Sequence, residues 1–291
     1  MSNANVLVVY KESAYSRFLS TKQLIRSLKK DKYWNIILGS HQRHNAALKR
    51  VREILRAEGL AATLVLRNQI HRLKDVDQKY RLVISVGGDG TLLDSSHCVE
   101  KTPILGVNSD PKRSVARFSG CDVTTFQKVL KGYLQGRLKP VLVPRLEFFV
   151  NNRKNKWLIL NDLLVTTLSP AGTSRYVLKV GAKLEEQISS GVWISTAAGS
   201  TAAIQSAGGK ILPVVSKKFQ FVVREAYQKK FGPRRLLKGV LGSPNYLEMV
   251  SHMREGRLFV DGANLVVPFR LGNRLKIGLS NKPLKVIGLK S

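Results

Sequence analysis

Short apolar runs alternate with helical patterns over the N-terminal part of the chain. Four runs rich in branched side chains have the length and composition of buried strands: Val6–Tyr10, Ala62–Leu66, Leu82–Val86 and Pro103–Val107. Apolar positions with helical spacing lie between these runs, over about residues 16–30, 45–58 and 91–99. Because strands that alternate with helices form parallel sheets, residues 1–115 predict an α/β domain with a Rossmann-like parallel sheet.

The pattern changes after about residue 115, where strand-like segments follow one another with few helices between them. These segments cover residues 141–151, 156–167, 174–181, 191–195, 219–224, 236–239, 258–260, 265–268 and 275–279. The polar run Asn151-Asn152-Arg153-Lys154-Asn155 predicts a hairpin turn between the first two. We therefore expect a β-rich second domain over residues 116–268, followed by a C-terminal segment over residues 269–291.

Several features of the composition narrow the class of protein. No apolar run reaches the roughly 18 residues that a membrane-spanning helix needs, so we expect no membrane partner. The first expected strand begins at Val6, which leaves no room for a signal or transit peptide before it. Cys98 and Cys121 are too few for a disulfide framework. We therefore expect a globular, cytoplasmic protein.

The chain is strongly basic. Lys and Arg number 49 against 19 Asp and Glu, which gives a formal net charge of +30. Such a surface attracts polyanions, including nucleotides, polyphosphate, nucleic acid and anionic membranes. The basic residues are scattered in short clusters and form no long basic tail, so a general bias of the proteome towards Lys and Arg explains the charge equally well.

A glycine-rich turn, Gly87-Gly88-Asp89-Gly90-Thr91, directly follows the expected strand that ends at Val86. Ligands of open α/β sheets bind at the carboxyl ends of the strands, and glycines before a helix let phosphate approach free N–H groups. The Asp89 carboxylate then has two candidate tasks: to accept the proton of an attacking hydroxyl, or to hold Mg²⁺ beside phosphates. The structural alternative is a tight turn in which Asp89 caps the helix. A Walker-type site is disfavoured, because the Lys-Ser/Thr ending of a P-loop is missing.

Two later segments place polar groups in apolar surroundings. Asn161-Asp162 interrupts the apolar run Leu160–Val165, where an unpaired amide and carboxylate would be costly. The segment Ser195–Ala203 is rich in small and hydroxyl side chains and leads into a helical pattern that ends at Gly208-Gly209. Its hydroxyl and N–H groups suit a phosphate or a base edge. The structural alternatives are a bulge with locally bonded polar groups at the first segment and close helix packing at the second.

Taken together, the three segments resemble the NAD kinase family. That family has a Gly-Gly-Asp-Gly motif, then an Asn-Glu/Asp pair in a strand, then Thr-x-x-Gly-Ser-Thr-Ala leading to Ser-Ala-Gly-Gly, and all occur here in that order. The resemblance extends to residues 106–111 and 259–262, so it covers most of the chain. The details are most similar to the plant NADH kinases at residues 160–162, 169–171, 174–176, 189–191 and 196–199.

The resemblance implies both a fold and a reaction. The fold is an N-terminal α/β domain and a C-terminal β-sandwich-like domain, with the final strand returning to the first. The reaction is phosphoryl transfer from ATP, or from polyphosphate, to the 2′-hydroxyl of the adenosine ribose of NAD or NADH, with Mg²⁺ as the divalent cation. The products are NADP or NADPH. Members of the family commonly form homodimers or homotetramers.

Roles for particular residues follow from the same resemblance. Asp89 is the implied catalytic base. The residues implied to contact nucleotide are Gly87, Gly88, Gly90 and Thr91 at phosphates, Asn161 and Asp162 at the ribose hydroxyls or the adenine edge, and Thr201, Ala202, Ser206 and Phe118 around adenine. We expect no metal site made of protein ligands alone. His41 and His44 have the spacing of a metal pair, but no third ligand is evident nearby.

The chain departs from the family pattern in a few places. Ala197-Ala198 stands where the family has Pro-Thr, Ala203 where it has Tyr, and Ser190 where an Asp is common. The nicotinamide end of the implied pocket is therefore less charged and less aromatic. The choice between NAD and NADH stays open at this point.

Two other classes of function are alternatives. Diacylglycerol kinases share the Gly-Gly-Asp-Gly-Thr turn but usually follow it with Asn-Glu and lack Gly-Ser-Thr-Ala. Here Leu92-Leu93-Asp94 follows the turn, and Gly199-Ser200-Thr201-Ala202 is present. A non-enzymatic polyanion or nucleic-acid binder would show steeply salt-dependent binding. It would leave Asp89 and Asn161-Asp162 without a role, because carboxylates weaken such binding.

Overall fold

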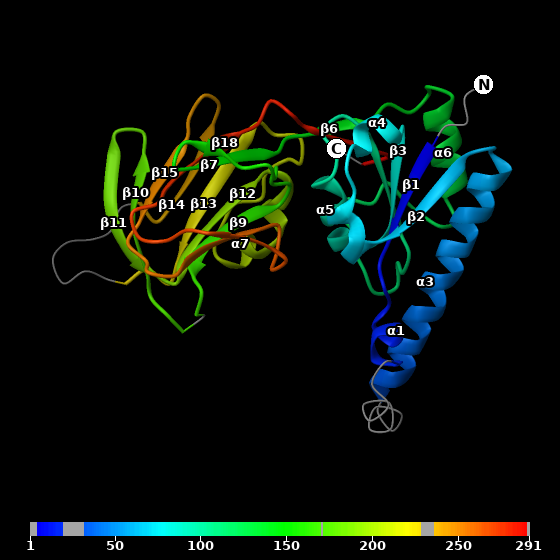
Figure 1. The fold of residues 1–291 in the computed structure, drawn as a ribbon, viewed down its shortest axis with the longest axis horizontal. Helices are drawn as coiled ribbons and strands as arrows, with labels where there is room; N and C mark the ends of the chain where they lie inside the picture. Colours follow the sequence, from blue (N-terminus) through cyan, green and yellow to red (C-terminus); the bar gives the residue numbers. More distant parts are fainter. Residues whose placement is uncertain (1–4, 20–31, 170, 228–235, 290–291) are drawn as a thin grey trace. The chain divides into compact units, whose positions relative to one another are not determined.

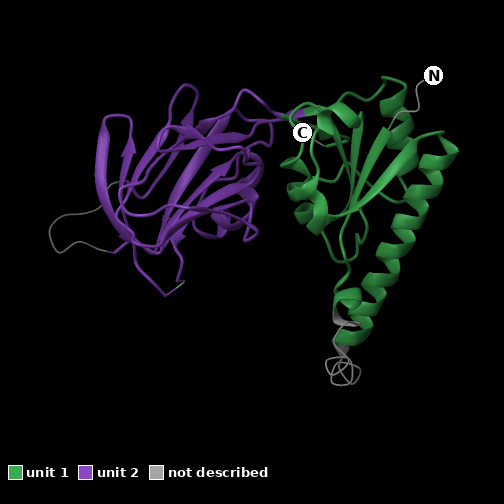
Figure 2. Cartoon of the chain, viewed as in Figure 1, with its two compact units in different colours: residues 1–141, 284–290 green, residues 142–283, 291 purple. Residues whose placement is uncertain are grey.

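The computed structural model describes residues 5–19, 32–169, 171–227 and 236–289. The chain divides into two compact units, which are coloured green and purple in Figure 2. Unit 1 contains residues 1–141 and 284–290, and unit 2 contains residues 142–283.

Unit 1 is built on one sheet with the strand order β2-β1-β3-β4-β19-β6, and β5 pairs with β4 at the side (Figure 1). The strands are β1 Asn5–Tyr10, β2 Ala61–Leu66, β3 Leu82–Gly87, β4 Ile104–Asn108, β5 Cys121–Asp122, β6 Val141–Val143 and β19 Leu284–Ile287. The pairs β1–β2, β1–β3, β3–β4, β4–β5 and β4–β19 are parallel. The predicted parallel α/β sheet is therefore confirmed, and so is the return of the final strand.

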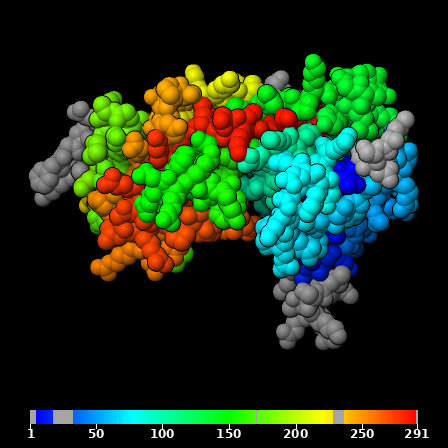
Figure 3. Space-filling view, turned by 45° about the horizontal axis from the view of Figure 1, so that its top comes forward, coloured from blue at the N-terminus to red at the C-terminus, as the bar shows by residue number. Residues whose placement is uncertain are grey.

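Helices cover both faces of this sheet. They are α1 Ala14–Leu19, α3 Lys32–Ala57, η1 Arg67–Arg72, α4 Val76–Lys79, α5 Asp89–Ser96 and α6 Phe126–Leu134. Apolar side chains of α3 and α6 pack on the face that carries Val6 and Val8, and α5 lies across the sheet from α3 (Figure 1). In Figure 3 the cyan segment that carries α4 lies on the surface of unit 1.

Some predicted boundaries in this unit differ from the structure. The helix expected from about residue 45 begins at Lys32, and the aromatic pair Tyr15–Trp34 packs α1 against its first turns at 5.3 Å between ring centroids. Residues 20–30 of the first predicted helix lie outside the described residues. Residues 116–141 belong to unit 1, not to the second domain, because β5 joins β4 and α6 buries Phe126 and Leu130 on the same sheet.

Unit 2 contains two antiparallel six-stranded sheets, in the orders β11-β10-β15-β18-β7-β8 and β14-β13-β12-β9-β16-β17. The strands of the first sheet are β7 Leu146–Val150, β8 Arg153–Lys154, β10 Ser174–Val180, β11 Lys183–Ser189, β15 Leu247–Ser251 and β18 Arg274–Leu279. Those of the second are β9 Asp162–Thr167, β12 Gly191–Thr196, β13 Lys218–Arg224, β14 Lys238–Gly242, β16 Gly256–Val260 and β17 Leu265–Pro268. The hairpin turn predicted over Asn151–Asn155 is shorter in the structure: it is made by Asn151 and Asn152 and joins β7 to β8, which lies within the predicted turn.

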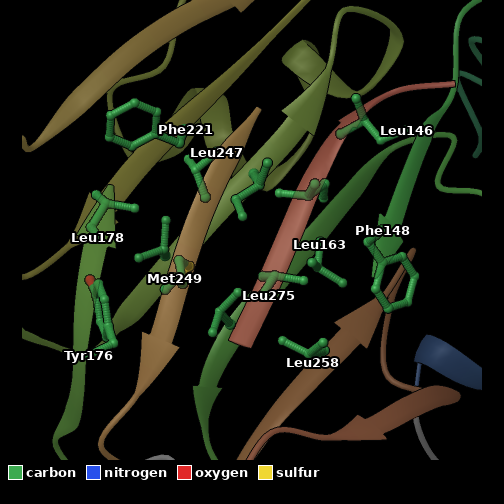
Figure 4. Close-up of a cluster of buried hydrophobic side chains, with 14 of the residues drawn as sticks. Leu146, Phe148, Leu163, Tyr176, Leu178, Phe221, Leu247, Met249, Leu258 and Leu275 are labelled. Atoms are coloured by element: carbon green, nitrogen blue, oxygen red, sulfur yellow. The ribbon is translucent and has the colours of Figure 1, made fainter. Parts of the chain in front are cut away.

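Both sheets contribute to one apolar core, as expected of a sandwich-like domain. Figure 4 shows Phe148, Tyr176 and Met249 from the first sheet near Leu163, Phe221 and Leu258 from the second. Only β19 returns to unit 1, so residues 269–283, which contain β18, belong to unit 2 rather than to a returning segment. The strands β11 and β15 were not predicted; β11 is an edge strand with mostly exposed or half-buried side chains and two glutamates, so its sequence lacks an apolar run.

Candidate active site

The glycine-rich turn joins β3 to α5 at the carboxyl edge of the parallel sheet. β3 ends at Gly87, and α5 begins at Asp89 after an extended Gly88. The carbonyl of Gly87 accepts a hydrogen bond from the N–H of Ser109 (3.0 Å), directly after β4. The turn therefore lies where open α/β sheets bind ligands, as predicted.

A polar side chain lies close to the position where each glycine of the turn would carry a Cβ. A Cβ at Gly87 would overlap the side chain of Thr91, which is buried. A Cβ at Gly88 would stand 2.7 Å from Ser114 Oγ. At Gly90 it would stand 3.1 Å from Nη1 of Arg67. The contacts are closest at Gly87 and Gly88, and they show that Ser114 and Arg67 lie beside the turn.

The carboxylate of Asp89 is held by the backbone of the segment after β4. Oδ2 accepts the N–H of Arg117 (2.9 Å), and Oδ1 accepts the N–H of Phe118 (2.8 Å). Asp89 makes no side-chain cap of α5, so the helix-cap alternative is wrong. Phe118 meets Asp89 through its N–H, while its ring is 4% exposed and lies in the interior of unit 1.

Few backbone groups at the start of α5 are left for an anion. The N–H of Thr91 donates to the carbonyl of Gly88 (3.0 Å). The N–H groups ahead of it, on Asp89 and Gly90, are those that a helix start leaves without an intrahelical acceptor. Thr91 itself, with its side chain buried, shapes the turn from within.

In unit 2, a carboxylate organises the Asn161-Asp162 pair. Asp261, at the end of β16, accepts the N–H groups of Leu160 (2.9 Å), Asn161 (2.7 Å) and Asp162 (3.0 Å). Its own N–H donates to the carbonyl of Asp162 (2.9 Å). Residues 156–161 do not form the predicted strand: Ile159 makes only an isolated bridge to Leu146, and β9 begins at Asp162.

The small-residue segment packs directly against this pair. The carbonyl of Asn161 accepts the N–H of Thr196 (2.9 Å) and the hydroxyl of Ser195 (3.1 Å). A Cβ at Gly199 would overlap the backbone of Asn161. The structure therefore brings the second and third motifs together within unit 2. The side-chain oxygen Oδ1 of Asn161 is buried, and no described residue donates a hydrogen bond to it.

Hydroxyl groups of the small-residue segment divide into two sets. Thr196 and Ser200 are buried and bond to the backbone: Thr196 Oγ1 donates to the carbonyl of Leu160 (2.5 Å), and Ser200 Oγ accepts the N–H of Leu212 (2.9 Å). Thr201 ends the short helix η2 (Ala198–Thr201) and is half-buried, and Ser206 ends α7 (Ala203–Ser206) and is exposed. Ala202, half-buried, joins the two helices. Thr201 and Ser206 are thus the hydroxyls left for a ligand.

Comparison with known proteins adds to this geometry. A model of the family described as ATP-NAD kinase N-terminal domain matches residues 7–138. A protein of Oryza sativa subsp. japonica, named probable NADH kinase, is 31% identical over 267 residues, covering 84% of this chain and 81% of that protein. The NADH kinase of Arabidopsis thaliana is 33% identical over 279 residues, covering 84% of this chain and 83% of that protein.

The chain belongs to the NAD kinase family. It is accordingly an enzyme of the NAD kinase type, and the lipid-kinase and non-enzymatic alternatives fall away.

Solved structures of NAD kinases have the same fold. An NAD kinase from Archaeoglobus fulgidus in complex with ATP matches with a TM-score of 0.70 at 20% identity, covering 98% of this chain and 94% of that one. Yeast NADH kinase complexed with NADH matches with a TM-score of 0.68 at 17% identity, covering 99% and 84%. At these identities the likeness shows the NAD kinase fold.

The described residues offer a metal ion few protein ligands. They contain no group of three or more His, Cys, Asp or Glu side chains that could hold one. Asp89 is the only carboxylate within the glycine-rich turn. This set fits Mg²⁺ that arrives with a nucleotide, since Mg²⁺ is commonly bound by one or two carboxylates and by substrate phosphates. Among the described helices, none is long and apolar enough to cross a membrane.

Three residues of this NAD kinase were not singled out as site residues from the sequence: Arg67, Ser114 and Asp261. Arg67 directly follows the predicted strand Ala62–Leu66, so its place at the carboxyl edge was a usable signal. Asp261 lies in the late segment that resembles the family, but nothing local indicates its partners. Ser114 has no sequence signal, since only the loop's path brings it to Gly88.

Asp162 has an unusual electrostatic environment. Its side chain is buried, and burial together with the negative charge of Asp261 raises the pKa of Asp162 to about 7 from an ordinary value of 3.8. The folded protein therefore binds a proton here that the unfolded chain releases between those two pH values. Because the folded state binds more protons, its free energy of unfolding falls as pH rises through that window.

We expect Asp162→Asn to remove this pH dependence. The melting temperature Tm of the wild type should fall relative to that of the variant by roughly 5 °C between pH 5 and pH 8, as the buried carboxylate becomes charged. Calorimetry of both proteins across that range measures the difference between their Tm values. Groups that titrate in both proteins change both Tm values equally and drop out of this difference. Parallel Tm curves for the two proteins would contradict the assignment.

Proposed function

We propose that this enzyme transfers the terminal phosphoryl group of ATP to the 2′-hydroxyl of the adenosine ribose of NAD or NADH. The observation that carries the proposal is Asp89, a carboxylate oriented by two backbone N–H groups inside the glycine-rich turn at the carboxyl edge of the sheet. Asp89 accepts the proton of the 2′-hydroxyl as that oxygen bonds to the γ-phosphorus, and the bond to the bridging oxygen breaks to release ADP. Mg²⁺ bound to ATP supplies positive charge that neutralises the phosphates.

The acceptor is held by unit 2 in this proposal. Asn161 has a buried Oδ1 that no described residue bonds, and a ribose hydroxyl or the adenine amino group is the donor it lacks. The neighbouring Asp162 accepts from the ribose hydroxyls when ionised. Thr201, Ala202 and Ser206 line the adenine side. Phe118 contributes through its backbone N–H, which orients Asp89, rather than through its buried ring.

The substrates are proposed from the named relatives. The rice and Arabidopsis relatives are named NADH kinases, and the yeast structure contains NADH, which supports NADH as an acceptor beside NAD. The archaeal structure contains ATP, which supports ATP over polyphosphate as the donor. Ala203 and Ser190 leave the nicotinamide end of the pocket without an aromatic or acidic side chain at those positions, which suits the uncharged ring of NADH.

A direct assay tests the proposal. Purified protein is incubated with Mg-ATP and either NAD or NADH, and NADP and NADPH are quantified by chromatography. We expect product from at least one acceptor, with more from NADH. Polyphosphate as donor and diacylglycerol as acceptor are run in parallel as controls. Folded protein that forms neither NADP nor NADPH would refute the proposal.

Assembly and location are further parts of the proposal. We expect a homodimer or homotetramer, as in other members of the family, and light scattering of the purified protein measures this directly. A cytoplasmic location is part of the same proposal. Burial raises the pKa of the Cys98 thiol to about 11 and that of the Cys121 thiol to about 12. Both side chains therefore stay as thiols at neutral pH and are poor nucleophiles.

A further inference from the structure

Arg67 lies beside the glycine-rich turn although it comes from a different strand. It directly follows β2 and opens η1. Because β2 and β3 both run parallel to β1, their carboxyl ends meet at the same edge of the sheet. The guanidinium of Arg67 lies over Gly90: the position of a Cβ there is 3.1 Å from Nη1 and 3.4 Å from Nη2. A side chain at residue 90 would crowd the guanidinium, which would have to shift by a few tenths of an ångström.

Asp94, one turn further along α5, fixes the orientation of this guanidinium. Nε of Arg67 donates to Oδ2 of Asp94, and the two side chains are 35% and 19% exposed. No other hydrogen bond from the Arg67 side chain occurs among the described residues. The planar group is therefore anchored by one edge, while Nη1 and Nη2, which carry the remaining N–H donors, face the turn.

A second cation comes close to Arg67 at this edge. Lys11 directly follows β1, the strand between β2 and β3. Burial and the positive charge of Arg67 lower the pKa of Lys11, and the negative charge of Asp110 opposes this shift. Asp110 is itself engaged by Arg43, whose Nε and Nη2 donate to its two oxygens at 2.6 and 3.2 Å. Lys11 and Arg67 both carry positive charge at the edge of the sheet where the glycine-rich turn lies, and this charge favours an anionic ligand there.

We propose that Arg67 binds the phosphate chain of the nucleoside triphosphate donor through Nη1 and Nη2, while Asp94 holds it by Nε. Arginine suits this task because its planar fork matches two phosphate oxygens at once. Asp94 has a second effect. Without Arg67 its negative charge would stand uncompensated on the helix that begins at the donor site, and it would repel phosphate. The identity of the bound nucleotide as the phosphoryl donor rests on the proposed function. The binding of a nucleotide's phosphate chain by Arg67 does not.

Kinetics of Arg67→Gln test the proposal. We expect the KM for ATP to rise about 10- to 100-fold, the range for losing a hydrogen bond to a charged group, with the KM for the dinucleotide unchanged within about twofold. Arg67→Gln/Asp94→Asn should regain part of the loss, because the uncompensated charge is gone. Arg72→Gln, at an exposed position of the same short helix, is the matched control and should leave the KM for ATP unchanged.

Calorimetric titration separates phosphate binding from a structural role. Arg67→Gln should weaken the binding of ATP and ADP by at least about tenfold and leave AMP binding near that of the wild type. An unchanged KM and Kd for ATP would overturn the proposal. So would equal losses for ATP, AMP and the dinucleotide together with a lower Tm, since these indicate a structural role. If the wild type forms no NADP or NADPH, the proposed function fails, yet titration with ATP still decides the role of Arg67.

Discussion

Asp89→Asn is expected to lower kcat by about 10²- to 10⁴-fold, the contribution that a positioned general base makes. The variant retains the size of the side chain and loses the ability to take the proton of the 2′-hydroxyl. Substrate affinity should change little, because the glycines and N–H groups of the turn remain. Steady-state kinetics with ATP and the preferred dinucleotide, together with titration of each substrate, measure the two effects separately.

The structure shows why a control is needed for this variant. Both oxygens of Asp89 accept backbone N–H groups, so the asparagine NH2 replaces one acceptor and faces an N–H. Asp77 is a matched control: its carboxylate accepts the N–H groups of Glu100, Lys101 and Thr102 at 2.7–3.1 Å, also in unit 1. Asp77→Asn should lower the Tm and leave kcat unchanged. Near-normal kcat in Asp89→Asn would remove Asp89 from the role of base, and lost affinity for both substrates would make its role structural.

Gly199→Ala should disrupt the acceptor region of unit 2. The added Cβ would stand 2.5 Å from the carbonyl carbon and 2.6 Å from the Cα of Asn161. These are backbone atoms, so neither can rotate away, and residues 160–162 must separate from the segment that follows β12. That movement breaks the hydrogen bond from the N–H of Thr196 to the carbonyl of Asn161. We expect a loss of about 3 kcal/mol of unfolding free energy, the upper end of the cost of overpacking.

Melting temperature and dinucleotide binding measure this effect. A loss of that size corresponds to a fall in Tm of roughly 5–10 °C, and we expect affinity for the dinucleotide to fall at least about tenfold. Gly242→Ala is the control in the same unit, because its nearest neighbours would be 3.4 and 3.9 Å from the new Cβ, an ordinary contact. If both variants melt near the wild type and bind normally, the packing of Gly199 on Asn161 does not support the site.

Local signals predicted the elements that position Asp89. The apolar runs that became β1, β2, β3 and β4 are continuous, and the glycines interrupt the pattern at the point where the chain turns. Strands without such runs were missed or misplaced. β11 is an edge strand with two glutamates, and β14, another edge strand, begins at Lys238 rather than at Leu236. Hydropathy identifies a strand by its buried side chains, and edge strands bury few.

Contacts between distant parts of the chain were decided by the tertiary structure. Asp261 reaches the N–H of Leu160 across 101 residues, and Arg67 reaches Asp94 across 27. Local composition cannot identify either pair, because any carboxylate of the chain is chemically able to accept these hydrogen bonds. Phe118 shows the same limit: the family resemblance implied an aromatic residue near adenine at this position after residues 106–108, whereas the fold buries the ring and its N–H donates to Asp89.

The amino-acid sequence by itself determined the parallel sheet, the turn at its carboxyl edge and the residue types available for phosphoryl transfer, since each depends on neighbours along the chain. The fold alone decided which groups orient Asp89, which carboxylate holds Asn161 in place and which arginine faces Gly90. Those choices depend on strand order and register, which bring together residues that the sequence keeps far apart.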